Sequence, residues 1–332
     1  MMKEAMFYDK QEGKNVRCNL CARRCLILPG KAGFCKVRKN VDGKLYSLVY
    51  GKCSSLAIDP IEKKPLFHFA PGTKCLSIAT VGCNFRCSFC QNWSISQEYG
   101  GIKGEELSPE QIVGIALKND IPGIAYTYTE PTVFYEYSFE TMKLAKKKGL
   151  YNVWVSNGYT APEAIEKMKG LLDAVNVDWK GSPEFYRKMC SVLDFEPVKE
   201  ALITYKKIGV LIEITNLLIP GKNDSEEDIR PMCRWIKENL GADTPLHFSA
   251  FYPQYKEDKI PKTSMEILEK AYKTAKEEGL HYVYIGNVLS DKSSTFCPKC
   301  NEKVIDRSGY SASIVHEKCP KCGFCIMIRN LK

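Results

Sequence analysis

The sequence predicts an α/β fold in which a partial (β/α) barrel lies between two small cysteine-rich modules. From residue 74 to residue 289, short apolar, β-branched runs alternate with amphipathic stretches, which is typical of strand–helix units around a parallel sheet. Cysteines cluster on both sides of this region. We therefore expect a cysteine-rich N-terminal module at 1–73, the barrel at 74–289 and a zinc-ribbon module at 290–332.

The N-terminal module has four cysteines in the spacing C-x2-C-x3-C-x9-C: Cys18, Cys21, Cys25 and Cys35. Four thiolates complete the ligand set of a zinc ion or of a second iron–sulfur cluster, and the spacing leaves both open. Free buried thiols are the alternative. Cys53 or Cys75 could take the place of one ligand in either metal site.

The barrel region contains seven strand-like runs, at 75–82, 124–129, 152–157, 174–179, 210–219, 245–252 and 281–287. Helices are expected between them at 108–120, 134–149 and 225–241, and glycines close the second and third. In the first of these helices, Ser108 is the predicted N-cap and Pro109 starts the first turn. Pro231 is expected to kink the third.

Six or seven such units fit a barrel, closed or incomplete, better than a doubly wound sheet, although the pattern alone does not give strand order. In a barrel the functional groups lie at the carboxyl ends of the strands. Cys83, Glu130, Asn157 and Asp178 each lie at, or directly after, the carboxyl end of a predicted strand. We expect these four residues to lie at one end of the barrel.

A loop directly after the first barrel strand contains Cys83, Cys87 and Cys90 in the spacing C-x3-C-x2-C. A closed structural zinc site needs four ligands, whereas three thiolates on a [4Fe-4S] cluster leave one iron free to bind another molecule. The spacing therefore favours such a cluster over zinc or an incidental group of thiols.

The C-terminal module has two C-P-x-C knuckles, formed by Cys297 and Cys300 and by Cys319 and Cys322. Paired knuckles present four sulfurs to one ion, so we expect a zinc ribbon, with Cys325 as a surplus thiol. The module is also basic, which suits either RNA or a plain solvated surface, through Lys299, Lys303, Arg307, Lys318, Lys321 and Arg329.

The cytoplasm is the expected compartment, because the sequence has no apolar run of transmembrane length and no signal-peptide pattern at its start. In a reducing compartment, 16 cysteines favour metal sites or catalysis over disulfides. The formal net charge of +9 omits the negative charge of metal-bound thiolates. The true positive excess is thus smaller, and neither nucleic acid nor a membrane is an expected partner.

The cysteine loop, placed after the strand that opens a (β/α) barrel, resembles the radical S-adenosylmethionine (SAM) superfamily. The resemblance implies that the three thiolates hold a [4Fe-4S] cluster whose fourth iron chelates the amino and carboxylate groups of SAM. It also implies reductive cleavage of SAM to a 5′-deoxyadenosyl radical, which abstracts hydrogen from a substrate that the sequence does not reveal.

The same resemblance assigns cofactor contacts to residues at successive strand ends. Phe89 is expected near the adenine, and Asn92 resembles the asparagine of a related CHN motif. Thr129 and Glu130, with Thr127, lie in YTYTEP, where the family receives the amino group of SAM.

Four further residues match family motifs at the next two strand ends. Ser156 and Asn157 lie where side chains bond ribose hydroxyls, and Asp178 and Lys180 match a D-x-K motif for the ribose and the cofactor carboxylate. Later in the chain, His247 and Tyr252 are either adenine contacts or plain core residues. Cys190 is predicted to donate a hydrogen atom or to act as a ligand. The alternative is that it is a small buried hydrophobic residue.

More closely, the chain resembles the radical enzyme of the AmmeMemoRadiSam system, a relative of pyruvate formate-lyase activating enzymes. The stretches that support this resemblance are at 17–38, 58–73, 81–97, 126–137 and 177–190. The resemblance implies a radical oxidoreductase, a flavodoxin or ferredoxin electron donor, and association with Memo-like and AMMECR-like proteins. A glycyl-radical-enzyme activase proper is one alternative. A non-catalytic, zinc-rich nucleic-acid-binding protein is another, but the three-cysteine loop and the barrel pattern argue against it.

Overall fold

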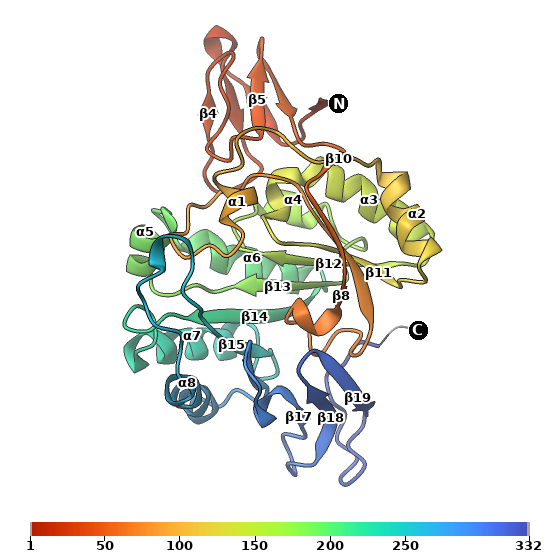
Figure 1. The fold of residues 1–332 in the computed structure, drawn as a ribbon, viewed down its shortest axis with the longest axis vertical. Helices are drawn as coiled ribbons and strands as arrows, with labels where there is room; N and C mark the ends of the chain where they lie inside the picture. Colours follow the sequence, from red (N-terminus) through yellow and green to blue (C-terminus); the bar gives the residue numbers. More distant parts are fainter. Residues whose placement is uncertain (1, 331–332) are drawn as a thin grey trace.

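An eight-stranded sheet is the centre of the computed structural model, which describes residues 2–330 (Figure 1). The order across the sheet is β16-β15-β14-β13-β12-β11-β9-β8. The seven strands from β9 to β16 pair in parallel, and β8 pairs antiparallel to β9 at one edge. The strands are β8 (Ser55–Pro60), β9 (Lys74–Ala79), β11 (Gly123–Tyr126), β12 (Tyr151–Ser156), β13 (Ala174–Asp178), β14 (Leu211–Leu218), β15 (Leu246–Ala250) and β16 (Val283–Gly286).

The sheet has the winding of a barrel that does not close. From β9 onward each strand pairs with the next one along the chain, which is the barrel order and not the reversed order of a doubly wound sheet. Among the described residues, the edge strands β8 and β16 do not pair with each other. All seven predicted strands are confirmed, and the sheet also takes in β8 from the stretch expected to form the N-terminal module.

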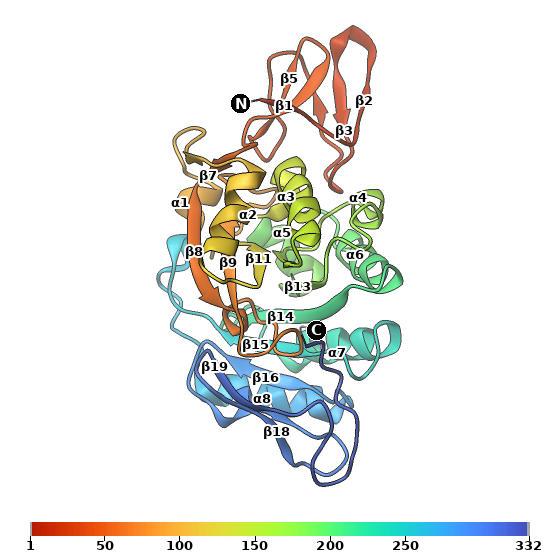
Figure 2. The same cartoon turned by 90° about the vertical axis from the view of Figure 1, so that its right-hand side faces the viewer.

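Helices cover the outer face of the sheet (Figures 1 and 2). The predicted cap of the first long helix is confirmed, because the Gln111 amide donates to Ser108 Oγ over 3.2 Å and the Ser108 amide donates to Gln111 Oε1 over 2.8 Å. Pro231 lies inside α7, and its kink stays a prediction. The helices are α1 (Trp93–Ser96), α2 (Pro109–Lys118), α3 (Tyr135–Lys147), α4 (Pro162–Glu166), α5 (Pro183–Cys190), α6 (Glu196–Lys207), α7 (Glu226–Asn239) and α8 (Met265–Glu277), with the 3-10 turns η1 (Glu12–Lys14), η2 (Ile61–Lys63), η3 (Pro131–Phe134), η4 (Tyr255–Glu257) and η5 (Asp291–Ser293).

Short strands build the N-terminal module, which projects from one end of the molecule in Figure 1. It has one sheet of β1 (Lys3–Glu4), β6 (Lys44–Ser47) and β5 (Arg38–Val41), and a second of β2 (Tyr8–Lys10), β3 (Val16–Cys18) and β4 (Leu26–Ile27); β7 (Lys52–Cys53) pairs with β10 (Glu105–Glu106). The barrel approaches this module tightly at Gly82, since a Cβ there would lie 2.6 Å from Val37 Cγ1. The φ of +98° at Gly82 also favours glycine.

A buried ion pair joins this module to the barrel. Arg38 Nη1 lies 2.7 Å from Glu136 Oε2, and Arg38 Nη2 lies 2.9 Å from Glu136 Oε1. The two side chains are only 3% and 1% exposed. Both also bond the backbone of Met6, because Arg38 donates to its carbonyl over 2.8 Å and its amide donates to Glu136 over 2.7 Å. Residues from β5, α3 and the chain start are thus held at one buried point.

The C-terminal module docks on the opposite side of the sheet from the N-terminal one, as Figure 2 shows. It is a three-stranded sheet of β17 (Thr295–Phe296), β18 (Lys303–Ser308) and β19 (Ser311–Val315). The prediction that Arg307 belongs to a basic surface is wrong, because its side chain is buried and donates to the Phe67 carbonyl over 2.5 Å. Arg329 is exposed, yet its amide and carbonyl bond residues 68 and 70 of the barrel.

No helix within residues 2–330 is long and apolar enough to cross a membrane.

We predict that Glu136→Gln lowers the free energy of unfolding by about 3–5 kcal/mol, because it leaves the Arg38 charge buried without a counterion. Urea unfolding followed by circular dichroism measures the loss. The control is Glu166→Gln, in the exposed pair with Lys207 at 3.0 Å, which should cost little or nothing. Equal losses of unfolding free energy in the two variants would contradict a stabilising role of the buried pair.

Candidate functional site

The cysteine loop lies at the carboxyl edge of the parallel sheet. Cys83, Cys87 and Cys90 lie between the end of β9 and the start of α1, and Glu130 and Asn157 follow the neighbouring strands β11 and β12. The Asn157 amide donates to Glu130 Oε2 over 2.8 Å, and its side-chain nitrogen lies 3.9 Å from Cys83 Sγ. The structure therefore brings the loop and two strand ends into direct contact.

The three loop sulfurs are not arranged for a single ion. Among the residues that the structure describes, the only group of three or more ligand atoms that all lie within 4.8 Å of one another is in the C-terminal module. At least one separation between the sulfurs of Cys83, Cys87 and Cys90 is therefore larger. Wider spacing is what a polynuclear cluster requires, because each thiolate binds a different iron.

Protein groups already contact the loop sulfurs. The Phe85 amide lies 3.4 Å from Cys83 Sγ, and Ser96 Oγ lies 3.2 Å from Cys90 Sγ. Burial raises the pKa of the Cys83 and Cys90 thiols, since a thiolate loses its hydration there. Bound iron removes this conflict by neutralising the thiolate charge, so the donor set fits a cluster.

Cys190 lies behind the loop, at the end of α5. Its side chain is fully buried and lies close to the Cys87 thiol, and this neighbour, together with burial, raises the pKa of Cys87. The backbone of the helix end also holds the loop, because the Arg86 amide donates to the Cys190 carbonyl over 3.1 Å and the Ser88 amide donates to the Met189 carbonyl over 2.9 Å. The thiol thus reaches a cluster ligand, and its predicted chemical role stays a prediction.

The Glu130 carboxylate is buried and joins several elements. Its Oε1 accepts from the Thr132 amide over 3.0 Å, from Thr132 Oγ1 over 2.6 Å and from Ser156 Oγ over 2.9 Å. Within residues 2–330, Oε2 accepts only from the Asn157 amide. Burial raises the pKa of Glu130, and these hydrogen bonds oppose the rise. A cationic group could therefore still pair with the free lone pairs of Oε2.

The predicted ribose contacts at the end of β12 are used within the protein. Ser156 Oγ also accepts from the Gly158 amide over 3.1 Å, and the Asn157 side chain donates to Asn84 Oδ1 over 2.7 Å and accepts from the Tyr159 amide over 3.0 Å. Both residues are buried. The structure places them as supports of the loop and of Glu130, and contact with a ribose stays a prediction.

A lysine and an aspartate form a more open part of the site. Lys180 Nζ lies 2.8 Å from Asp178 Oδ2, with the side chains 14% and 35% exposed. Burial opposes the charge of Lys180, but Asp178 and the thiols of Cys87 and Cys190 outweigh it and raise the pKa of the lysine. Its nitrogen also lies 5.8 Å from the centre of the Phe89 ring. A fixed positive charge thus stands beside the cysteine loop.

Three other predicted contacts, Asn92, Thr129 and Phe89, lie in the cysteine loop or in the YTYTEP stretch. Asn92 Nδ2 donates to the Tyr128 carbonyl over 2.7 Å, which joins the loop to the YTYTEP stretch, and Thr129 Oγ1 donates to the Thr80 carbonyl over 2.9 Å. Phe89 is buried against Phe185, with ring centres 5.6 Å apart.

The two late aromatic candidates are not brought to the loop in the same way. His247 is the second residue of β15, far from its carboxyl end, and its Nε2 lies 2.7 Å from the buried carboxylate of Glu213. It packs on Phe67 and Tyr284, so the core interpretation is the one that its surroundings support. Tyr252 is 41% exposed and bonds the Asn287 carbonyl over 3.2 Å.

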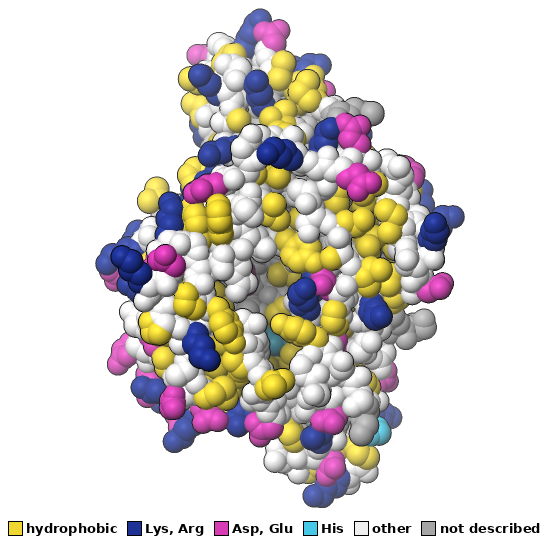
Figure 3. Space-filling model, in the orientation of Figure 1, with side chains coloured by type: hydrophobic (Ala, Val, Ile, Leu, Met, Phe, Trp, Pro, Cys, Tyr) yellow, Lys and Arg dark blue, Asp and Glu magenta, His cyan; other side chains and the backbone are white. Residues whose placement is uncertain are grey.

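Figure 3 shows that the protein surface is hollowed near the middle of the face seen in Figure 1, between the segments labelled β8 and β14. Hydrophobic side chains and few charged ones border this hollow. Such a surface admits a ligand or a partner segment with little net charge.

The four knuckle cysteines of the C-terminal module come together as predicted. Cys297 Sγ lies 3.6 Å from Cys322 Sγ, and Cys300 Sγ lies 3.4 Å from Cys319 Sγ. All four sulfurs lie within 4.8 Å of one another, so the group can bind a single metal ion. Cys325 is exposed and outside the group.

No separate motif in the sequence pointed to Asn84 or Thr132. Asn84 lies inside the cysteine motif, is 1% exposed, and bonds Asn157. Thr132 follows Glu130 by two residues and donates two hydrogen bonds to its carboxylate. The sequence held two weak signals. Asn84 is a polar residue within a cysteine motif, and Thr132 follows Glu130 and Pro131.

Comparison with known proteins gives a consistent result. The family model described as the Radical SAM superfamily matches residues 77–236. The chain is 46% identical to the uncharacterized Methanocaldococcus jannaschii protein MJ0808 over 97% of this chain and 98% of that one. It is 27% identical to the pyruvate formate-lyase-activating enzyme of Clostridium pasteurianum over 47% of this chain and 66% of that enzyme.

Among solved structures, a radical SAM methyltransferase from Sphaerobacter thermophilus has a similar fold. Its TM-score is 0.51 at 15% identity, over 66% of this chain and 68% of that one.

We predict that replacing Cys297 and Cys300 together by Ser removes about one tightly bound zinc per chain, because two of the four thiolates are lost. Metal analysis of the purified full-length protein measures this. Cys325→Ser is the matched control, since this thiol is exposed and outside the group. Unchanged zinc in the double variant would contradict the predicted ribbon site.

Proposed function

Because the chain belongs to the radical SAM superfamily, we propose that it binds a [4Fe-4S] cluster through Cys83, Cys87 and Cys90 and uses this cluster to cleave SAM reductively. The observation that carries the proposal is the three-cysteine loop at the carboxyl edge of the sheet, whose sulfurs are too far apart for one ion. When bound, the cluster and SAM supply the one-electron chemistry that opens a carbon–sulfur bond and starts hydrogen abstraction from a substrate.

Charged residues of the chain can orient the zwitterionic end of SAM. Lys180 offers a positive charge for its carboxylate, while the free lone pairs of Glu130 Oε2 suit its ammonium group. The contribution of Glu130 to the pKa of Cys83 places its charge close to the loop. The two groups come from different strand ends but lie beside the same cysteine loop, one near Cys83 and one near Cys87, and favour one orientation of the ligand.

Asp178 and Phe89 complete the proposed cofactor contacts. The family resemblance adds five further residues: Thr129, Asn92, Ser156, Asn157 and Tyr252. Asp178 pairs with Lys180 and is partly exposed, so its second oxygen can accept from a ribose hydroxyl. Ser156 and Asn157 act by positioning Glu130 and the loop. Cys190 acts, in this proposal, on the cluster through its proximity to Cys87.

The activating enzymes of glycyl radical enzymes are the best-supported comparison for the reaction. A relative described as a putative glycyl-radical enzyme activating enzyme of Methanocaldococcus jannaschii is 28% identical over 48% of this chain. We propose the AmmeMemoRadiSam radical enzyme as the finer assignment, with a flavodoxin or ferredoxin as electron donor and Memo-like and AMMECR-like proteins as partners. An activase proper is the second candidate.

We predict that replacing Cys83, Cys87 and Cys90 together by Ala removes about four irons and four sulfides per chain from anaerobically reconstituted protein. Iron and sulfide analysis measures the loss. In the unaltered protein, added SAM should change the electron paramagnetic resonance spectrum of the reduced cluster, since it binds the open iron. A triple variant that keeps this SAM-sensitive signal would contradict the assignment.

We predict that Glu130→Gln weakens SAM binding by about 1.5–3 kcal/mol, about 10- to 150-fold in Kd, because a charge-assisted hydrogen bond is lost. Glutamine keeps acceptors for Thr132 and Ser156, whereas alanine would leave these buried donors unpaired. Equilibrium dialysis with the oxidised cluster measures Kd. Glu213→Gln, at an equally buried glutamate beside His247, is the control and should leave Kd unchanged. An unchanged Kd for Glu130→Gln would show that the ammonium lies elsewhere.

A further inference from the structure

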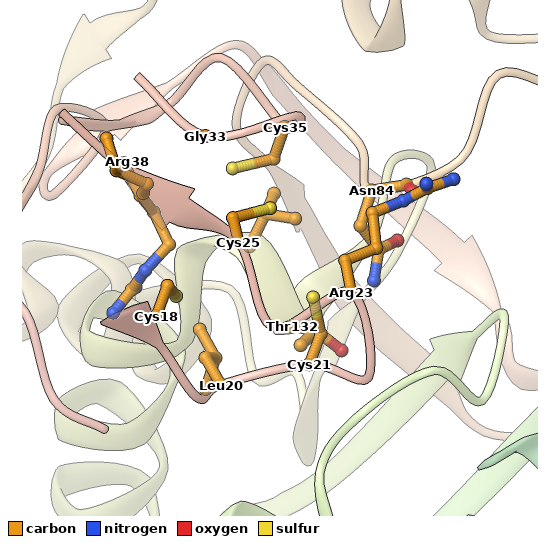
Figure 4. A pocket seen from close by; sticks show the side chains of 12 residues that line it. Cys18, Leu20, Cys21, Arg23, Cys25, Gly33, Cys35, Arg38, Asn84 and Thr132 are labelled. Atoms are coloured by element: carbon orange, nitrogen blue, oxygen red, sulfur yellow. The ribbon is translucent and has the colours of Figure 1, made fainter. Parts of the chain in front are cut away.

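The four cysteines of the N-terminal module line one cavity next to the cysteine loop. Cys18, Cys21, Cys25 and Cys35 line one small cavity, and Figure 4 shows their side chains around it. Asn84 of the cysteine loop and Thr132 of η3 line the same cavity. The module thus encloses a thiol-lined space against the barrel.

Two groups of four cysteines in the same chain are arranged differently. The C-terminal four bring all sulfurs within 4.8 Å, as one tetrahedral ion requires, whereas in the described residues the N-terminal four form no group within this limit. The N-terminal cysteines are therefore spaced around an occupant larger than a single ion.

Two buried donors of this cavity have no partner within the part of the chain that the structure describes. They are Arg38 Nε and Asn84 Nδ2, and both residues are buried. A buried N–H without an acceptor is costly, so its presence beside four thiols indicates an acceptor that fills the cavity. An iron–sulfur cluster offers bridging sulfides as well as thiolates, while a four-cysteine zinc site offers thiolates alone.

The cavity also lies directly behind the proposed catalytic loop. Asn84 is the neighbour of Cys83 in the chain, and its Oδ1 accepts from Asn157, whose side-chain nitrogen lies 3.9 Å from Cys83 Sγ. On the other side, Thr132 donates to Glu130. One short path of hydrogen-bonded side chains therefore connects the thiol-lined cavity with the loop.

We infer that Cys18, Cys21, Cys25 and Cys35 hold a second iron–sulfur cluster, which passes electrons to the cluster on Cys83, Cys87 and Cys90. This inference rests on the proposed function. A reduced ferredoxin- or flavodoxin-type protein gives one electron to the N-terminal cluster, and the N-terminal cluster gives one electron to the loop cluster. The donor is oxidised by one electron, the loop cluster is reduced by one electron, and the N-terminal cluster returns to its starting state.

The identity of the metal is tested in the full-length protein without altering the N-terminal cysteines. After anaerobic reconstitution, the unaltered chain should hold about eight irons and eight sulfides, and the Cys83, Cys87 and Cys90 triple alanine variant about four of each. The variant, once reduced, should keep a paramagnetic signal that SAM does not change. Zinc without sulfide at this site overturns the inference. A triple variant that holds neither iron nor sulfide also overturns it.

These outcomes separate the inference from the proposed function, which fails instead if the triple variant loses no iron. Electron transfer is tested by Asn84→Ala, which keeps every cysteine, with Cys233→Ala at a buried thiol of α7 as control. Reduction of the loop cluster by a reduced ferredoxin should slow in Asn84→Ala, while reduction by dithionite is unchanged. Equal rates with ferredoxin in the variant and the control overturn the relay.

Discussion

The buried carboxylate of Glu130 is the interaction on which the proposed site depends. It receives hydrogen bonds from η3 and from the end of β12, so two neighbouring strand ends are fixed to each other. Through Asn157 and Asn84 the same network reaches Cys83. Parallel pairing of β9, β11 and β12 brings these ends to one edge, and the carboxylate turns that proximity into a defined geometry.

Burial of ionisable groups gives this edge its chemical character. Thiols at Cys83, Cys87 and Cys90 have raised pKa values, while Lys180 stays charged beside them. Without iron, thiolates in this position would be poorly solvated negative charges. A cluster resolves that conflict, and the remaining charges of Lys180 and Glu130 are then available for a zwitterionic ligand.

The elements predicted from local pattern agree with the structure, and the differences come from long-range contacts. Alternating apolar runs located all seven parallel strands, and Ser108 marked its helix start. The sequence could not show that β8 pairs antiparallel with β9, or that Arg307 is buried against Phe67, because both depend on how distant segments dock. His247 had a suitable residue type, but its position at the start of β15 takes it to Glu213.

The central claim is most directly tested by the fate of SAM on the anaerobically reconstituted, reduced protein. Mass spectrometry of the products should find methionine and 5′-deoxyadenosine in equal amounts, formed only when the loop cluster is present and a reductant is supplied. Intact SAM recovered from protein that holds its full complement of iron and sulfide would contradict the account.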